Sequence, residues 1–256
     1  GVGRGDRVAV VAPNSGAYVV LWLAVARIGA VLVPVNPALG PEELARILDH
    51  AEPALVVRDP AEWVVDGPRV RLPSDVGPDE TCVIVYTSGS TGFPKGVMHS
   101  QRTVVAVGEA FVERMWLQPD DRLLCVLPLF HINALLYSVG GALAAGGSLV
   151  MAPRFSASGF WPLVASSGAT EVNLIAAVGT ILARRPRTEV VAGHTRLKAT
   201  RELGMPPSMS ASVAAGPAAG ATDGGAVSQS AAVAATAAPA AMPAPSSQRR
   251  RLRSRQ

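Results

Sequence analysis

Aromatic side chains are scarce in this 256-residue chain and are absent from its last 95 residues. They make up 5% of the sequence, and the last of them is Trp161. Between Ala211 and Ala240 nearly half of the residues are alanine, and most others are Gly, Pro, Ser, Thr or Val. Such a segment has too little large apolar surface to offset its chain entropy. We therefore expect an ordered domain over residues 1–194 and a disordered, low-complexity tail over residues 195–256.

Acidic residues are also scarce in the tail. Residues 198–256 carry seven basic and two acidic side chains, whereas residues 1–197 carry 16 basic and 17 acidic ones. Five of the basic residues are arginines gathered between Arg249 and Arg255. This cluster can touch nucleic acid or an anionic membrane through charge alone, but it has no aromatic group for stacking on bases. We expect no specific nucleic-acid partner.

The chain has only two cysteines and no long apolar run. Cys82 and Cys125 have 42 residues between them, which fits neither a metal site nor a redox pair, so we expect core thiols in a reducing compartment. The longest strongly apolar run, residues 17–26, is shorter than the ~20 residues that a membrane span needs. No charged-then-apolar leader precedes it. We expect a cytoplasmic protein without a membrane span and without a metal site formed by its side chains.

Strand and helix patterns alternate through the first two hundred residues. This alternation predicts an α/β fold in which mixed sheets are layered with flanking helices. Strands are expected at residues 7–12, 31–35, 54–57, 82–85, 122–127, 148–151 and 170–175. Helices are expected at residues 16–28, from Pro41 onward, and at 100–115, 132–145, 155–166 and 178–185. Either Asn14 or Ser15 caps the first helix.

One stretch is too rich in hydroxyl groups and glycine to be only a connector. It follows the strand-like run 82–85 and reads Tyr86-Thr87-Ser88-Gly89-Ser90-Thr91-Gly92-Phe93-Pro94-Lys95-Gly96-Val97. Gly89 and Gly92 allow positive φ and a close approach to a ligand, so that several N–H groups can point into one concavity. The hydroxyls add donors, and Lys95 adds a positive charge. The stretch therefore predicts a phosphate site.

The spacing does not fit the common phosphate loop, G-x-x-x-x-G-K-S/T. It resembles, position for position, the signature loop of the adenylate-forming (AMP-binding) enzymes, which include acyl-CoA synthetases, peptide-synthetase adenylation domains and luciferases. The resemblance extends from residue 1 to about residue 194, and Gly5–Val10 is similar to the opening of the family's large N-terminal domain. It implies a partial N-terminal domain, an N-terminal fragment that lacks a few dozen preceding residues.

The resemblance also implies a chemistry. Enzymes of this family activate a carboxylate by attack on the α-phosphate of ATP and then pass the acyl group to a thiol such as coenzyme A. ATP, Mg²⁺, coenzyme A and a small-molecule carboxylic acid are thus the implied ligands. Because an anion must approach a polyanion, donors and cations must spread the phosphate charge. The residues implied to hold the β- and γ-phosphates are Thr87, Ser88, Gly89, Ser90, Thr91, Gly92 and Lys95, and Lys95 is a catalytic candidate.

His131 is the second catalytic candidate. It lies at a strand end, before an apolar helix, where the family places an aromatic residue or a histidine beside the carboxylate. Phe130 and Asn133 complete the implied substrate pocket, with Phe130 lining it and Asn133 orienting a polar group. The alternative for an isolated histidine is a surface or core residue with a satisfied hydrogen bond. The stretch from Phe155 to Pro162, with His131-Ile132-Asn133 upstream, is similar to the carnitine and crotonobetaine CoA ligase branch. The alternative is that Phe160-Trp161 is simply the core face of a helix.

Several motifs of the family's later parts do not occur in this sequence. They are an aromatic-Gly-x-Thr-Glu segment, an aspartate for the ribose, a hinge arginine and a lysine in a small C-terminal domain. Losing one such group typically costs ~10²-fold in rate, so we expect little or no turnover from this chain alone. A reading-frame shift between His194 and Lys198 would explain the abrupt change of composition. Two rival hypotheses are a noncatalytic nucleotide-binding or phosphate-binding module and a nonfunctional frameshifted product.

Overall fold

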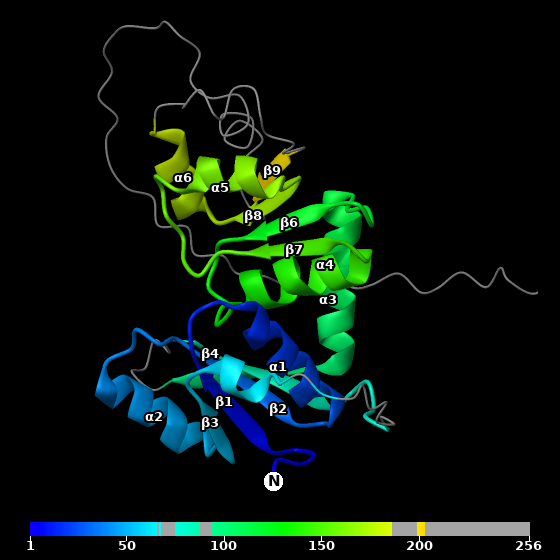
Figure 1. Ribbon diagram of the computed structural model, residues 1–256. Coiled ribbons are helices and arrows are strands. Elements are labelled where there is room, and N and C mark those ends of the chain that lie inside the picture. Colours follow the sequence, from blue (N-terminus) through cyan, green and yellow to red (C-terminus); the bar gives the residue numbers. More distant parts are fainter. Residues whose placement is uncertain (66, 68–74, 88–93, 186–198, 203–256) are drawn as a thin grey trace, which may run out of the picture. The chain divides into compact units, whose positions relative to one another are not determined.

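The computed structural model describes residues 1–65, 67, 75–87, 94–185 and 199–202, in which two β-sheets are flanked by helices (Figure 1). This confirms the predicted α/β class. The described residues all belong to one unit, Gly1–Ala218. The predicted tail lies outside the described residues except for residues 199–202.

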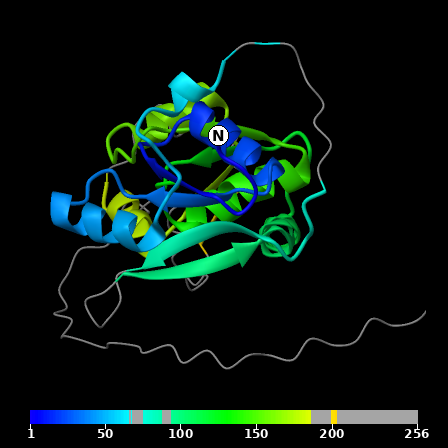
Figure 2. The ribbon, with the colours of Figure 1, turned by 90° about the horizontal axis from the view of Figure 1, so that it is seen from below.

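The first sheet has the strand order β3-β1-β2-β4-β5. Its strands are β1 (Arg7–Val11), β2 (Val31–Val35), β3 (Leu55–Val57), β4 (Thr81–Thr87) and β5 (Lys95–Ser100). The first four are parallel, whereas β5 returns antiparallel to β4, as the two adjacent teal strands in Figure 2 show. The helices that follow these strands are α1 (Gly16–Arg27), α2 (Pro41–Ala51), the 3₁₀ turn η1 (Pro60–Trp63) and α3 (Gln101–Met115).

The second sheet is parallel throughout, with the order β7-β6-β8-β9. Its strands are β6 (Arg122–Cys125), β7 (Ser148–Met151), β8 (Glu171–Leu174) and β9 (Ala199–Glu202). A π-helix, η2 (Asn133–Val139), runs directly into α4 (Gly140–Ala145), and α5 (Phe160–Ser167) and α6 (Ala176–Ala183) complete this half.

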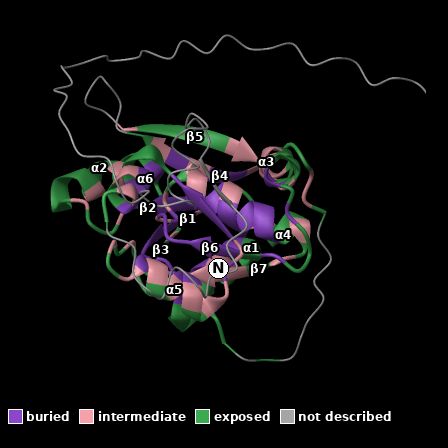
Figure 3. Ribbon diagram, turned by 90° about the horizontal axis from the view of Figure 1, so that it is seen from above, coloured by how far each residue is buried: buried purple, intermediate pink, exposed green. Residues whose placement is uncertain are grey.

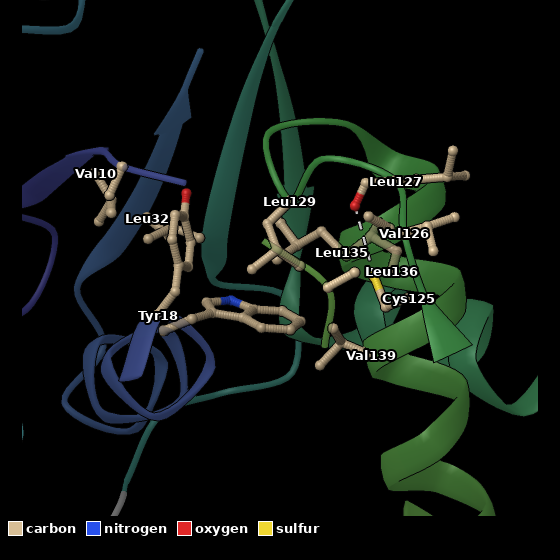
Figure 4. Packing of buried hydrophobic residues seen from close by; sticks show 14 of the residues in the cluster. Val10, Tyr18, Leu32, Cys125, Val126, Leu127, Leu129, Leu135, Leu136 and Val139 are labelled. Atoms are coloured by element: carbon tan, nitrogen blue, oxygen red, sulfur yellow. Dashed lines mark hydrogen bonds between the residues drawn. The ribbon is translucent and has the colours of Figure 1, made fainter. Parts of the chain in front are cut away.

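A single hydrophobic cluster joins the two sheets. It contains Val10 and Leu32 from the first sheet, Leu124 and Leu135 from the second half, and Trp22 of α1. Figure 4 shows side chains from both halves facing one another, and Figure 3 shows the buried residues, in purple, along β1 and β2. Burial of this apolar surface is the main force that holds the sheets together.

Two helices pack closely enough to require glycine. A Cβ atom built on Gly108 of α3 would lie 2.7 Å from the carbonyl oxygen of Gly140. Gly141 sits beneath the ring of Phe111, where a Cβ would come within 2.5 Å of the ring. The small residues therefore allow α3 to lie directly on the start of α4.

Three local expectations differ from the structure. The helix expected at 155–166 begins at Phe160, and the one expected at 132–145 starts as a π-helix. The strand β9 lies within the predicted tail, because its backbone pairs in register with β8 and continues the parallel sheet. The domain boundary at residue 194 stays a prediction.

One alternative left open by the sequence, the cap of the first helix, is resolved. Ser15, not Asn14, caps α1, since its side chain accepts a hydrogen bond from the Tyr18 N–H at 3.1 Å. Phe160 is 1% exposed and belongs to the hydrophobic cluster, so it serves the core face of α5. Within the described part of the chain, no helix combines the length and the hydropathy of a membrane-spanning segment.

Candidate functional site

The predicted phosphate loop connects the two strands of a hairpin. Strand β4 is buried at Val83 and Val85 and reaches the surface at Thr87, which pairs with Lys95 as β5 begins. Both side chains are exposed. The predicted loop residues between them, namely Ser88, Gly89, Ser90, Thr91 and Gly92, lie outside the described residues. The structure thus fixes the two ends of the loop.

Tyr86 supports this hairpin from one side. Its hydroxyl forms a 2.7 Å hydrogen bond with Nδ1 of His50, at the end of α2, and the two rings meet edge to face. A Cβ atom on Gly96 would lie 3.3 Å from Cζ of Tyr86, so the ring lies across the glycine on the neighbouring strand. Partial burial raises the pKa of Tyr86, which keeps the phenol neutral. The base of the loop is therefore fixed by contacts from α2.

His131 lies in the turn between β6 and the π-helix. Its N–H donates to the Pro128 carbonyl at 3.0 Å, and its own carbonyl accepts from Ala134 and Leu135. The imidazole is exposed on one side and contacts Phe130 on the other, with 4.6 Å between ring centroids. Desolvation lowers the pKa of His131 below its usual range. The imidazole is therefore neutral at neutral pH and has one donor and one acceptor nitrogen.

A cavity of about 600 Å³ joins these two regions. Its described lining is mostly apolar and comes from the ends of β4, β6 and β8 and from the π-helix: Val85, Tyr86, Thr87, Leu127, Pro128, His131, Ile132, Asn133, Tyr137 and Ile175. The structure thus brings the predicted residues Thr87, His131 and Asn133 to one cavity. Lys95 and Phe130 are not among its described lining residues.

Sequence reasoning missed Tyr86, Tyr137 and Ile175 as lining residues. Ile175 directly follows β8, and the carboxyl ends of parallel strands meet at one edge of a sheet, where ligands of α/β proteins usually bind. Its position after a strand was therefore a usable signal. No such signal exists for Tyr137, because the face of the helix on which its side chain lies depends on the π-helical turn.

No group of three or more His, Cys, Asp or Glu residues in the described ranges is arranged to hold a metal ion. Cys82 and Cys125 are buried free thiols, as predicted. The groups that the described residues of the candidate site can use to bind a ligand are hydroxyls, amides, the imidazole of His131 and the ammonium group of Lys95.

Comparison with known proteins places these features in a family. The family described as AMP-binding enzyme matches residues 1–242. A sulfoacetate–CoA ligase from Cupriavidus necator is 33% identical over an alignment 236 residues long, and the alignment covers 81% of this chain and 46% of that protein. A crotonobetaine/carnitine–CoA ligase from Shigella sonnei is 29% identical, over 73% of this chain and 43% of that protein. The chain spans less than half the length of these curated relatives.

Solved structures agree with the sequence relatives. The inhibitor-bound N-terminal domain of FACL13 from Mycobacterium tuberculosis superposes with a TM-score of 0.70 at 26% identity, over 82% of this chain and 60% of that one. ATP-bound MatB from Rhodopseudomonas palustris gives the same TM-score at 28% identity, over 79% of this chain and 45% of that one. Both the sequence and the fold thus point to one family.

Proposed function

The chain belongs to the AMP-binding enzyme family, and on this premise we propose that its N-terminal domain, residues 1–194, binds ATP phosphates and a carboxylic acid as part of an acid–CoA ligase. One observation carries the proposal. The base of the hydroxyl-rich loop, at Thr87, opens into the same cavity as His131 and Asn133. A polyphosphate bound by the loop and a carboxylate bound beside His131 would therefore be neighbours.

In this proposal the loop and Lys95 hold the polyphosphate chain. Hydroxyl and amide donors contact phosphate oxygens, and the ammonium group of Lys95 offsets part of their charge. As pyrophosphate departs from the α-phosphate, the bonding electrons go to its bridging oxygen, and nearby donors and cations stabilise that charge. Thr87 lines the cavity, so its hydroxyl, together with phosphate oxygens, would hold Mg²⁺.

His131 would orient the carboxylate. A neutral imidazole can donate one N–H to a carboxylate oxygen without protonating it, so the other oxygen keeps its electron pair for attack on phosphorus. Asn133 lines the same cavity and would contact a polar group of the acid. The apolar remainder of the lining would reduce the access of water to a reactive acyl-adenylate.

The second candidate is a noncatalytic nucleotide-binding module. Lys95, a catalytic candidate, is not among the described lining residues of the cavity, which favours this module, and we propose that turnover by this chain alone is low or nil. Coenzyme A would be the acyl acceptor of the catalytic form. The buried free thiols suit a reducing compartment, and we propose a cytoplasmic location.

Pyrophosphate exchange into ATP tests the proposal. The acids to compare are sulfoacetate, crotonobetaine, carnitine and a long-chain fatty acid, and ATP binding is measured in parallel by calorimetry. Exchange that depends on one acid supports the ligase. ATP binding without exchange for any acid supports the noncatalytic module, and absence of both contradicts the proposed function.

A further inference from the structure

We propose that two buried asparagines, Asn14 and Asn173, are positioning residues that hold the segment from Leu127 to Asn133 and thereby place His131 at the cavity. The segment lies outside any strand and contains the candidate catalytic histidine. The role given to His131 rests on the proposed function, whereas the anchoring of the segment does not.

Asn14 anchors the upstream end. It is 7% exposed, and its side-chain amide makes three hydrogen bonds. Nδ2 donates to the carbonyls of Leu127 at 2.9 Å and Ala152 at 3.2 Å, and Oδ1 accepts from the Leu129 N–H at 2.8 Å. Leu127 and Leu129 follow the end of β6, so these backbone groups have left the sheet ladder. A carboxamide has two donors and an acceptor, so one side chain satisfies all three groups.

The Asn14 contacts also connect the two sheets. Asn14 follows β1 of the first sheet, whereas Leu127 follows β6 and Ala152 follows β7 of the second. Figure 4 shows Leu127 and Leu129 among the buried side chains of the hydrophobic cluster. The sheet that carries the phosphate loop is thus tied directly to the turn that carries His131.

Asn173 anchors the downstream end. This residue of β8 is 3% exposed, and its Nδ2 donates to the Asn133 carbonyl at 2.9 Å and to Oγ of Ser138 at 3.4 Å. The Ser138 hydroxyl donates to the same Asn133 carbonyl at 3.3 Å. The start of the π-helix is therefore held by a buried polar network from the neighbouring strand.

His131 lies midway between these anchors, two residues after Leu129 and two before Asn133. Its backbone is fixed by the turn, and its ring packs on Phe130. Loss of the Asn14 side chain removes three hydrogen bonds from buried backbone groups, and loss of the Asn173 side chain removes one of the donors to the Asn133 carbonyl. The turn can then shift to recover these hydrogen bonds. The ring would shift with the turn.

The first experiment needs no substitution. Amide hydrogen exchange of the ligand-free chain measures the protection of the Leu129 N–H against that of Leu32 in the central strand β2. We expect the Leu129 amide to be protected to within roughly tenfold of Leu32 although it lies outside any strand. Exchange of Leu129 at the rate of an unprotected amide overturns the proposal.

The second experiment compares Asn14→Ser and Asn173→Ser with Thr170→Val. Thr170 donates to Asp121 at 2.7 Å and accepts from the Arg122 N–H, at the opposite ends of β6 and β8. The readout is the imidazole Hε1 resonance of His131, identified by its loss in His131→Asn. We expect the chemical shift of this resonance to change in both asparagine variants and to stay unchanged in Thr170→Val. Urea unfolding confirms that each variant is folded.

The positioning role is contradicted if the His131 chemical shift is unchanged in a folded asparagine variant. It is also contradicted if the shift changes equally in Thr170→Val. If neither asparagine variant folds, the exchange of Leu129 in the unmodified chain decides. Both readouts are taken without ligand, so failure of ATP binding would overturn the proposed function and leave this inference standing.

Discussion

Thr87 and Lys95 face each other as the last residue pair of the antiparallel strands β4 and β5. The loop between them therefore starts and ends at adjacent points, and the charge of Lys95 is held beside the first hydroxyl of the loop. Thr87 also lines the cavity that contains His131. This pairing links the predicted phosphate loop to the candidate carboxylate site.

Removal of the Lys95 charge should weaken binding of ATP. We expect Lys95→Ala to lower ATP affinity by roughly 10- to 100-fold, because hydrogen bonds to charged groups are among the stronger polar interactions. Calorimetry measures the change. Arg46→Ala is the control, since Arg46 is an exposed cation on α2 whose partner is Glu42, four residues earlier. Equal losses in the two variants would show a general charge effect and would remove Lys95 from the site.

The contact between α3 and α4 should not tolerate a methyl group. A Cβ on Gly108 would lie 2.7 Å from a backbone carbonyl oxygen, so we expect Gly108→Ala to destabilise the chain by about 1–3 kcal/mol. Gly16→Ala, in α1, meets no atom within 4 Å and should stabilise by up to ~1 kcal/mol. Urea unfolding compares the two variants. A neutral Gly108→Ala would mean that the helices are further apart.

Stability should decline as the pH falls below the ordinary histidine value of about 6.5. Burial lowers the pKa of both His131 and His99, so the unfolded chain binds protons that the folded chain does not. The folded state is therefore favoured above this window and loses stability as the unfolded histidines become protonated. His131→Asn and His99→Gln should each reduce the pH dependence of the urea midpoint. If the urea midpoint depends on pH equally steeply in both variants and in the unmodified chain, the pH dependence does not come from these two histidines.

The two thiols should report whether the chain folds. Burial raises the pKa of Cys82 to about 11 and that of Cys125 to about 12, so few thiolates form at moderately alkaline pH. We expect both to react slowly with a disulfide reagent in buffer and rapidly in concentrated urea. Rapid reaction in buffer would instead support the hypothesis of a nonfunctional frameshifted product.

The sequence predicted elements that depend on local pattern and missed features that depend on distant contacts. The strand before the phosphate loop and the helix cap near Ser15 are short-range signals, and both are present. The three buried hydrogen bonds of the Asn14 side chain could not be predicted, because its partners lie 113 to 138 residues further along the chain. The π-helix and β9 were missed for the same reason, since side chains and strand edges elsewhere stabilise them.

The phosphate-binding role of the hairpin is tested most directly by titrating the chain with ATP and Mg²⁺ while following backbone amide resonances by NMR. We expect saturable shifts at Thr87 and Gly96, with little change at Leu55 on the far edge of the sheet, and their loss in Lys95→Ala. Absence of shifts at millimolar ATP, or identical shifts in Lys95→Ala, would contradict a phosphate site between Thr87 and Lys95.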